Sequence, residues 1–204
     1  MFSLIHQKMN KVKLHVYLME DKTMIEAVFI DRDGTLGGSD EVTLPNEFSL
    51  YPNTKKALDL LKEHNIKIFA FTNQPDISRG LCKQEDFENE LYGFGFDDLC
   101  ICPHTNEDNC ECRKPKTKML KQISDKYNIP LNDCFVIGYR WSDMVAGINV
   151  GAKVILVKTG AGRDTLTKYK DKWDINMVEK VSDDILDAVY CILSYNPKNY
   201  DSNL

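Results

Sequence analysis

The sequence predicts an α/β fold, a doubly wound parallel sheet with helices on both faces that forms a three-layer α/β/α sandwich. Short runs of apolar, β-branched and aromatic residues, typical of buried parallel strands, alternate along the chain with amphipathic helical stretches. Polar residues that stand out follow directly after several of these strands, where ligands bind in open α/β sheets. At 204 residues, the chain is long enough for one domain with a substantial core.

The predicted elements alternate in order. Strands are expected at 25–30, 66–71, 99–102, 133–138 and 153–157, and helices at 54–64, 83–91, 117–127, 142–150 and 183–193. Glycine, proline and aspartate mark a polar loop over 37–52. The domain is expected over 25–195, with an extension at 1–24 and a flexible tail at 196–204. Met24 is a possible start of the domain, and the sequence leaves the role of the preceding residues open.

Composition narrows the class of partner. The net charge of −5 disfavours nucleic acid, whose phosphates would be repelled, and no apolar run is long enough to cross a membrane. The first 24 residues contain no uninterrupted apolar stretch and no small-residue cleavage site, so they make a poor signal peptide. The seven cysteines cluster, which favours metal binding over a disulfide framework. We therefore expect a cytoplasmic protein; its oligomeric state is not predicted.

Two carboxylates follow the first strand. Asp31 and Asp33 are two residues apart, so on an extended chain both point to the same side, beyond the strand end. Gly34 allows the chain to turn where a Cβ would clash. Two close carboxylates repel each other unless a cation lies between them, and oxygen ligands favour magnesium. Taken alone, the same pattern is equally typical of an Asp-rich turn.

Three further polar positions follow strands. Thr72 and Asn73 offer a hydroxyl, an amide and backbone N–H groups that suit a phosphate, although a capped turn explains them as well. Lys114 is suited to holding a phosphoryl group, although most lysines lie on the surface. Asp143 could ligate a metal or interact with a helix dipole. Together they suit phosphoryl transfer, in which a carboxylate attacks phosphorus and a second carboxylate moves the proton.

The order of these residues resembles the four motifs of haloacid-dehalogenase-type phosphatases. The resemblance covers about 25–160 and rests on Asp31-x-Asp33-Gly34-Thr35, Thr72, Lys114 and Gly138-x-x-x-x-Asp143. It implies that Asp31 is the nucleophile and Asp33 the general acid/base. It also implies that Thr72 and Lys114 hold the phosphate, and that Asp31, Asp33 and Asp143 surround magnesium.

A branch of that family is similar in more detail. The segments 71–74, 78–80 and 112–115 resemble the branch containing heptose bisphosphate and histidinol phosphatases, which have a minimal cap. The resemblance implies that the substrate is contacted by Asn73, Gln74, Arg79 and Arg113. From the residues alone, both arginines are better explained as solvated surface residues.

A cysteine and histidine cluster supports the same branch. Cys102, His104, Cys110 and Cys112 are a typical ligand set for a closed tetrahedral zinc site. Four protein ligands leave no position for water, so the zinc is expected to be structural and to order the loop before Arg113 and Lys114. The remaining cysteines are interpreted as small buried apolar residues, namely Cys82, Cys100, Cys134 and Cys191.

The chain departs from the family pattern at two places. Tyr139 stands where the fourth motif usually has aspartate, and a neutral phenol in place of a carboxylate predicts weaker magnesium binding. Pro75-Asp76 replaces the usual Ser-Gly, which brings a negative charge near the phosphate site.

Three functions compete. The first is a magnesium-dependent phosphatase that hydrolyses a small phosphorylated metabolite, a sugar phosphate or a compound like histidinol phosphate, through an aspartyl-phosphate. The second is a catalytically impaired homologue that binds a phosphorylated ligand or a protein partner, as Tyr139 suggests. The third, a phosphatase of nucleic-acid ends, is disfavoured by the acidic composition.

Overall fold

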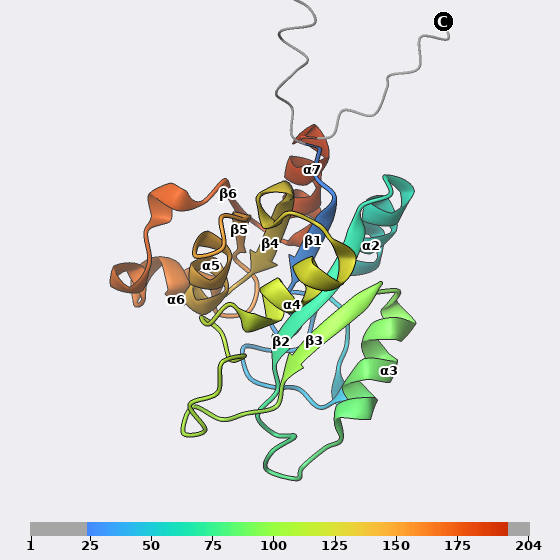
Figure 1. Ribbon diagram of the computed structural model, residues 1–204, viewed down its shortest axis with the longest axis vertical. Coiled ribbons are helices and arrows are strands. Elements are labelled where there is room, and N and C mark those ends of the chain that lie inside the picture. The colour runs from blue at the N-terminus through green and yellow to red at the C-terminus, as the bar shows by residue number, and fades with distance from the viewer. Residues whose placement is uncertain (1–23, 196–204) are drawn as a thin grey trace, which may run out of the picture.

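The computed structural model describes residues 24–195, which form a sheet of six parallel strands flanked by helices (Figure 1). The strands are β1 Ala27–Ile30, β2 Lys67–Asn73, β3 Asp98–Cys102, β4 Cys134–Gly138, β5 Lys153–Val157 and β6 Lys180–Ser182. Their order in the sheet is β3-β2-β1-β4-β5-β6, and every pair of neighbours is parallel. The predicted doubly wound α/β fold is therefore confirmed.

Helices cover both faces of this sheet. The α-helices are α2 Thr54–Glu63, α3 Gln84–Phe94, α4 Lys118–Tyr127, α5 Trp141–Ile148, α6 Gly162–Thr167 and α7 Ile185–Tyr195. Short 3₁₀ helices lie at Pro45–Glu47, Leu131–Asp133, Lys170–Lys172 and Ile175–Met177. Residues of α2, α3 and α7 pack in one apolar cluster with one face of the strands, and residues of α4 and α5 pack in a second cluster with the other face.

The sequences of the strands are almost continuously apolar because both faces of the sheet are buried. In β1, Val28 and Ile30 join the cluster with α2 and α7, whereas Ala27 and Phe29 join the cluster with α4 and α5. All four are at most 1% exposed. This two-sided burial is what a parallel sheet between two helical layers requires.

The structure corrects several predicted boundaries. The helix expected to stop before Gly93 continues to Phe94, and Gly95, with a φ of +90°, ends it. The second strand extends two residues further than predicted, to Asn73. Helix α6 and strand β6 were not predicted, because six and three residues are too short to show a periodic apolar pattern.

The interpretation of four cysteines as buried is correct for only one of them. Cys134 is buried, whereas the structure leaves three partly exposed, namely Cys82, Cys100 and Cys191. Apart from Met24, the predicted extension and tail lie outside the described residues. Between residues 24 and 195, none of the helices has the length and apolar character needed to cross a bilayer.

The sheet reverses its winding direction between β1 and β4. From β1 the chain adds β2 and then β3 on one side, and it returns to add β4, β5 and β6 on the other side. The loops that leave β1 and β4 therefore separate toward opposite faces. A crevice forms at such a reversal beyond the carboxyl ends of the strands, where α/β proteins bind ligands.

Candidate active site

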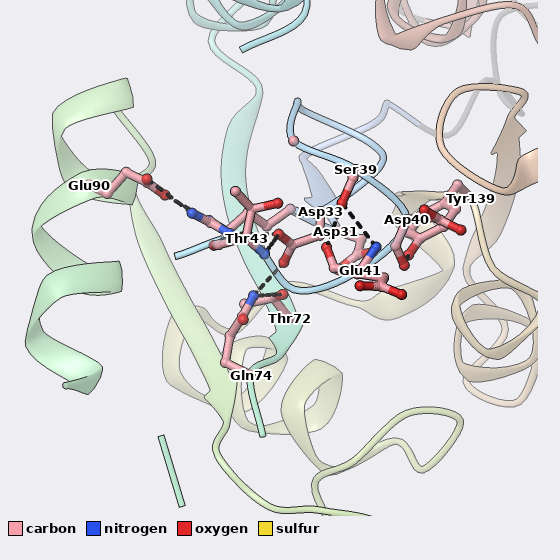
Figure 2. A network of polar contacts seen from close by, with 12 residues as sticks. Asp31, Asp33, Ser39, Asp40, Glu41, Thr43, Thr72, Gln74, Glu90 and Tyr139 are labelled. Atoms are coloured by element: carbon pink, nitrogen blue, oxygen red, sulfur yellow. Dashed lines mark hydrogen bonds and ion pairs between the residues drawn. The ribbon is translucent and has the colours of Figure 1, made fainter. Parts of the chain in front are cut away.

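A cavity of about 280 Å³ lies beyond the carboxyl ends of β1, β2 and β4. Six of the residues predicted from the sequence line it: Asp31, Asp33, Thr72, Asn73, Arg113 and Lys114. Figure 2 shows Asp31, Asp33 and Thr72 close together, at the ends of strands that are neighbours in the sheet. Residues far apart in the chain thus meet in one cavity because their strands are parallel.

Asp31 lies at the end of β1, where the sheet still holds its backbone. Its amide donates a hydrogen bond of 3.0 Å to the carbonyl of Ile137 in β4, and its side chain accepts one of 2.7 Å from Lys114 Nζ at Oδ1. The residue is 5% exposed, and this exposure is toward the cavity that it lines. A carboxylate held in this way has little rotational freedom.

Lys114 lies between two carboxylates. Its Nζ is 2.7 Å from Asp31 Oδ1 and 2.7 Å from Asp143 Oδ1, and it lies 4.3 Å from the centre of the Phe71 ring. Burial alone would lower the pKa of Lys114, but Asp143 and Asp31 raise it above its ordinary value. The lysine is therefore a permanent cation at the cavity.

Asp143 faces the lysine and does not line the cavity. Its Oδ2 accepts a hydrogen bond of 2.9 Å from the amide of Arg140, and the residue is fully buried. A Cβ on Gly138 would lie 2.4 Å from Asp143, so only glycine at that position allows this close approach. Burial, with Asp31 nearby, raises the pKa of Asp143 to about 6.

Asp33 is held by donors on both of its oxygens. Oδ1 accepts hydrogen bonds from Arg32 Nη1 (2.7 Å) and from the amide of Thr43 (2.9 Å), and Oδ2 accepts one from Gln74 Nε2 (2.6 Å). Burial raises the pKa of Asp33, while Arg32 opposes the shift. A raised pKa makes this carboxyl easier to protonate, which is the direction that suits the predicted general acid.

Of the three other substrate-contact candidates, Asn73 lines the cavity as Arg113 does, whereas Gln74 and Arg79 do not. Asn73 lines the cavity, and its Oδ1 accepts a 3.2 Å hydrogen bond from the amide of Lys114. Gln74 is fully buried and donates to Thr72 Oγ1 (2.9 Å) as well as to Asp33, but it does not line the cavity. Arg79 is exposed, pairs with Asp76 at 2.8 Å and lies outside the cavity lining. Substrate contact by these residues stays a prediction.

Tyr139 occupies the position where the motif usually has aspartate. It is 2% exposed, lines the cavity and donates a 2.9 Å hydrogen bond to the carbonyl of Asp40, to which Arg140 also donates. Figure 2 shows Tyr139 beside Asp40 in the loop that follows β1. Burial, with Asp31 nearby, raises the pKa of Tyr139 above its ordinary value. The phenol is therefore neutral and holds this loop at the edge of the cavity.

The predicted zinc ligands converge at one point. The candidate ligand atoms of Cys102, His104, Cys110 and Cys112 all lie within 4.8 Å of one another. Cys112 Sγ is 3.3 Å from Cys102 Sγ, 3.5 Å from Cys110 Sγ and 3.2 Å from His104 Nδ1. A tetrahedral zinc with sulfur ligands at about 2.3 Å has ligand edges of about 3.8 Å, so this set fits the ion with little adjustment.

The cysteine and histidine loop also places residues at the cavity. The Arg113 amide donates to Cys110 Sγ (3.4 Å), and its guanidinium donates to the carbonyl of His104 (3.0 Å) and to Asn106 Oδ1 (2.7 Å). Both Arg113 and Asn106 line the cavity. Order in this loop therefore determines the shape of one wall.

Comparison with known proteins identifies the family. A family model described as HAD-hydrolase-like matches residues 111–188. The D-glycero-beta-D-manno-heptose-1,7-bisphosphate 7-phosphatase of Helicobacter pylori is 33% identical over 139 residues, which are 63% of this chain and 80% of that protein. The chain belongs to the haloacid-dehalogenase-like hydrolases. The family and the enzyme class predicted from the motifs, a phosphatase, are confirmed.

Two further relatives support the assignment to the haloacid-dehalogenase-like hydrolases. The histidine biosynthesis bifunctional protein HisB of Actinobacillus pleuropneumoniae is 36% identical over 141 residues, 63% of this chain and 39% of that protein. The D,D-heptose 1,7-bisphosphate phosphatase of B. bronchiseptica, solved with magnesium and phosphate, superposes with a TM-score of 0.72 at 27% identity. The match covers 83% of this chain and 98% of that one.

The haloacid-dehalogenase-like family implies a magnesium ion, which the donors near Asp31 fit in part. Asp31 and Asp33 bring carboxylates to the cavity. The third predicted ligand, Asp143, uses its oxygens for Lys114 and the Arg140 amide, and Tyr139 offers only a neutral phenol. The motif positions therefore offer fewer anionic oxygens than a hard cation prefers, although the carboxylates of Asp40 and Glu41 line the same cavity. Weaker magnesium binding stays a prediction.

Sequence reasoning placed the segment 139–143 at the site but assigned no role to its residues 140–142, and it named no site residue in the later part of the loop after β1. Arg140, Trp141 and Ser142 line the cavity together with Asp40 and Glu41 of the loop after β1. Their position after β1 and β4 was a usable signal, because both loops follow strands that end at the site. Arg32 and its distant partner Glu90 were also missed, although a charged residue at the end of an apolar strand is itself unusual.

Proposed function

We propose that this protein is a phosphatase that hydrolyses the phosphate monoester of a small metabolite, a sugar phosphate or a compound like histidinol phosphate. The observation that carries the proposal is the 2.7 Å ion pair between Lys114 and Asp31, in a cavity that Thr72 and Asp33 also line. A carboxylate, a cation, a hydroxyl and a second carboxylate in one small cavity are the groups that phosphoryl transfer through an aspartyl-phosphate requires.

The reaction assigns one task to each group. Asp31 attacks phosphorus through a carboxylate oxygen, and the bond from phosphorus to the leaving oxygen breaks while Asp33 gives that oxygen a proton. Water then attacks the phosphorus of the aspartyl-phosphate while Asp33 takes a proton from that water. The bond between phosphorus and the Asp31 oxygen breaks, which releases inorganic phosphate and regenerates the Asp31 carboxylate. Lys114 and Thr72 stabilise the negative charge on the transferring oxygens. Magnesium, when bound beside Asp31, neutralises part of the same charge.

The cavity and the relatives support the proposed substrate class. A volume of about 280 Å³ admits a small metabolite. Arg113 and Arg140 line it as cations, and Asp40 and Glu41 line it as anions, so both phosphate and polar groups of a substrate find partners. The relatives named above, a heptose bisphosphate phosphatase and a bifunctional protein of histidine biosynthesis, support these two substrate classes.

A phosphate-release screen tests the proposal. Purified protein is incubated with sugar phosphates, histidinol phosphate and nucleotides, with and without magnesium. We expect release from a sugar phosphate or histidinol phosphate, stimulation by magnesium at high concentration, and complete loss in Asp31→Asn. Asp59→Asn, which alters an exposed carboxylate paired with Lys55, is the matched control. Turnover that persists in Asp31→Asn would contradict Asp31 as the nucleophile.

A second candidate function is a catalytically impaired homologue that binds a phosphorylated ligand or a protein partner. The neutral Tyr139 and the engagement of Asp143 by Lys114 favour it, because both weaken the cation site. This candidate predicts an inactive natural protein in which Tyr139→Asp produces activity. An active natural protein would reject it.

Three further expectations belong to the proposed function. The cysteine and histidine cluster is expected to hold a structural zinc, because four protein ligands complete a tetrahedral shell. Nucleic acid is not an expected partner, given the net charge of −5. A cytoplasmic location stays a prediction.

A further inference from the structure

Arg32, between the two aspartates, has no task in the proposed reaction. Its side chain is 0% exposed, and the residue does not line the cavity. A buried arginine is expensive unless its charge and its donors are matched. Its partners therefore indicate what the residue does.

The guanidinium of Arg32 joins three separate parts of the chain. Nη1 donates to Asp33 Oδ1 (2.7 Å) and to the carbonyl of Thr43 (2.7 Å). Nε and Nη2 donate in parallel to Glu90 Oε1 (2.7 Å) and Oε2 (3.0 Å) in helix α3. This two-pronged geometry fixes the plane and the direction of the guanidinium.

Two aromatic rings restrict the same group further. The guanidinium carbon lies 3.8 Å from the centre of the Phe48 ring and 4.9 Å from that of Phe87. Apolar residues of similar volume could fill such a buried position with equal or better stability, so a buried ion pair is weak evidence for a stabilising role. Precise placement of the neighbouring Asp33 is what this arrangement supplies.

The contacts of Asp33 determine where it can carry a proton. A carboxylate has about four lone-pair positions, two on each oxygen. Arg32 and the Thr43 amide take those of Oδ1, and Gln74 takes one on Oδ2. One lone-pair position of Asp33 therefore remains free, on Oδ2, and Asp33 is one of the residues that line the cavity.

We infer that Arg32 and Glu90 are positioning residues, which orient Asp33 so that only Oδ2 exchanges a proton with the leaving oxygen. The inference rests on the proposed function. Arg32 acts through Asp33, and Glu90 acts through Arg32. Helix α3, which contributes no residue to the cavity lining, thereby contributes to catalysis.

The test compares two esters that differ in their need for a proton. An alkyl ester such as β-glycerol phosphate leaves as a strong base and needs proton donation, whereas p-nitrophenolate leaves without it. The quantity kcat/KM covers only the steps through formation of the aspartyl-phosphate, so it isolates this proton transfer. Glu90→Gln keeps the size and one acceptor oxygen but removes the charge and the second acceptor.

We expect Glu90→Gln to lower kcat/KM about 10-fold to 100-fold for the alkyl ester and less than about threefold for p-nitrophenyl phosphate. The loss is smaller than the full general-acid contribution of about 10²–10⁴-fold because Asp33 is misplaced and not removed. Arg32→Lys keeps the cation but not the planar fork and is expected to show the same selective loss. If Glu90→Gln does not fold, Arg32→Lys takes its place in the test. Glu88→Gln, on the same helix with its carboxylate bonded to Gln84, is the matched control.

The outcomes separate this inference from the proposed function. Equal losses for both esters, or no loss for either, in an active protein would overturn the positioning role and leave the phosphatase assignment intact. A natural protein that releases phosphate from neither ester nor from any metabolite in the screen would overturn both. A selective loss for the alkyl ester supports both.

Discussion

The hydroxyl of Tyr139 shows how one residue can exchange a ligand role for an anchoring role. In the family motif this position usually carries a carboxylate, whereas here a buried phenol donates to the carbonyl of Asp40. Asp40 and Glu41 of the same loop line the cavity. The residue type predicted weaker magnesium binding, but the contact with the loop depends on the path of residues 37–44, which no local pattern specifies.

Replacing Tyr139 by phenylalanine tests the anchoring role. The change removes two hydrogen bonds, the one that the hydroxyl donates to the Asp40 carbonyl and the one that it accepts from Arg140 Nε. A net loss of about 1 kcal/mol or more is expected, so KM should rise about fivefold or more with kcat almost unchanged. Steady-state kinetics on the best metabolite substrate measure the effect. A fall in kcat at constant KM would show that the phenol acts on the reacting atoms instead.

Replacing Tyr139 by aspartate tests the cation site. An added anionic oxygen near Asp31 should tighten magnesium binding at least about tenfold, because hard cations prefer carboxylate oxygens. Titration calorimetry with magnesium alone measures the affinity without requiring turnover. Tyr139→Asn is the matched neutral control, and equal affinities in the two variants would contradict a direct role for the carboxylate.

The burial of the strands was easier to predict than the side-chain partners of the helices. Runs such as 27–30 and 134–138 are apolar throughout, so their burial followed from composition. The pairing of Glu90 in α3 with Arg32 after β1 joins residues 58 positions apart. It depends on how the helix packs, and a helical pattern identifies only its apolar side. The pairing of Asp143 in α5 with Lys114 likewise depends on helix packing, and the predicted magnesium contact of Asp143 stays a prediction.

The loop that contains the cysteine and histidine cluster holds Arg113 and Asn106 at the cavity, so loss of a predicted zinc ligand is expected to affect substrate binding. Cys110→Ser removes a predicted zinc ligand and the acceptor of the Arg113 amide. We expect loss of zinc in metal analysis and a rise in KM of about tenfold or more, since both residues line the cavity. Cys82→Ser, outside the cluster, should retain zinc and KM. Retention of stoichiometric zinc in Cys110→Ser would contradict the ligand assignment.

Asp98, at the start of β3, is expected to make a pH-dependent contribution to the free energy of unfolding. Asp98 Oδ2 pairs with Lys126 of α4 at 2.7 Å, and Oδ1 accepts the Leu99 amide at 2.9 Å. Burial alone would raise the pKa of Asp98, but these partners hold it below the ordinary 3.8. The carboxylate therefore stabilises the fold above that pH, and this contribution disappears as the pH falls through the lowered pKa.

We expect Asp98→Asn to lower the free energy of unfolding by about 0.5–1 kcal/mol at pH 7, because Lys126 is largely exposed and screened by solvent. The difference from the natural protein should shrink as the pH falls below about 4. Urea unfolding between pH 3 and pH 7 measures it. A difference that grows on acidification would show that the pKa is raised in the folded protein.

At the scale of the whole molecule, two apolar clusters share one sheet. Leu61 of α2 belongs to one and Leu120 of α4 to the other, and both are 0% exposed. The layered arrangement was predictable because strands and helices alternate along the chain. The strand order was not, since a short edge strand such as β6 gives no clear sequence signal.

This shared sheet predicts cooperative unfolding. Leu61→Ala and Leu120→Ala should each cost about 2–5 kcal/mol, the usual range for such cavities, and each should leave one transition with an unchanged denaturant slope. Far-ultraviolet circular dichroism and tryptophan fluorescence in urea should give the same midpoint. Separate midpoints for the two probes in either variant would show that the two faces unfold independently.

The packing of the Tyr139 ring has a consequence for mutational history. A Cβ on Gly34 would lie 2.9 Å from this ring and one on Gly160 would lie 3.0 Å from it. The ring therefore packs directly against both glycines and leaves no room for a side chain at either position. Tyrosine and aspartate codons differ only in their first base. One nucleotide change would thus place a carboxylate at this position and leave empty the space that the ring now fills.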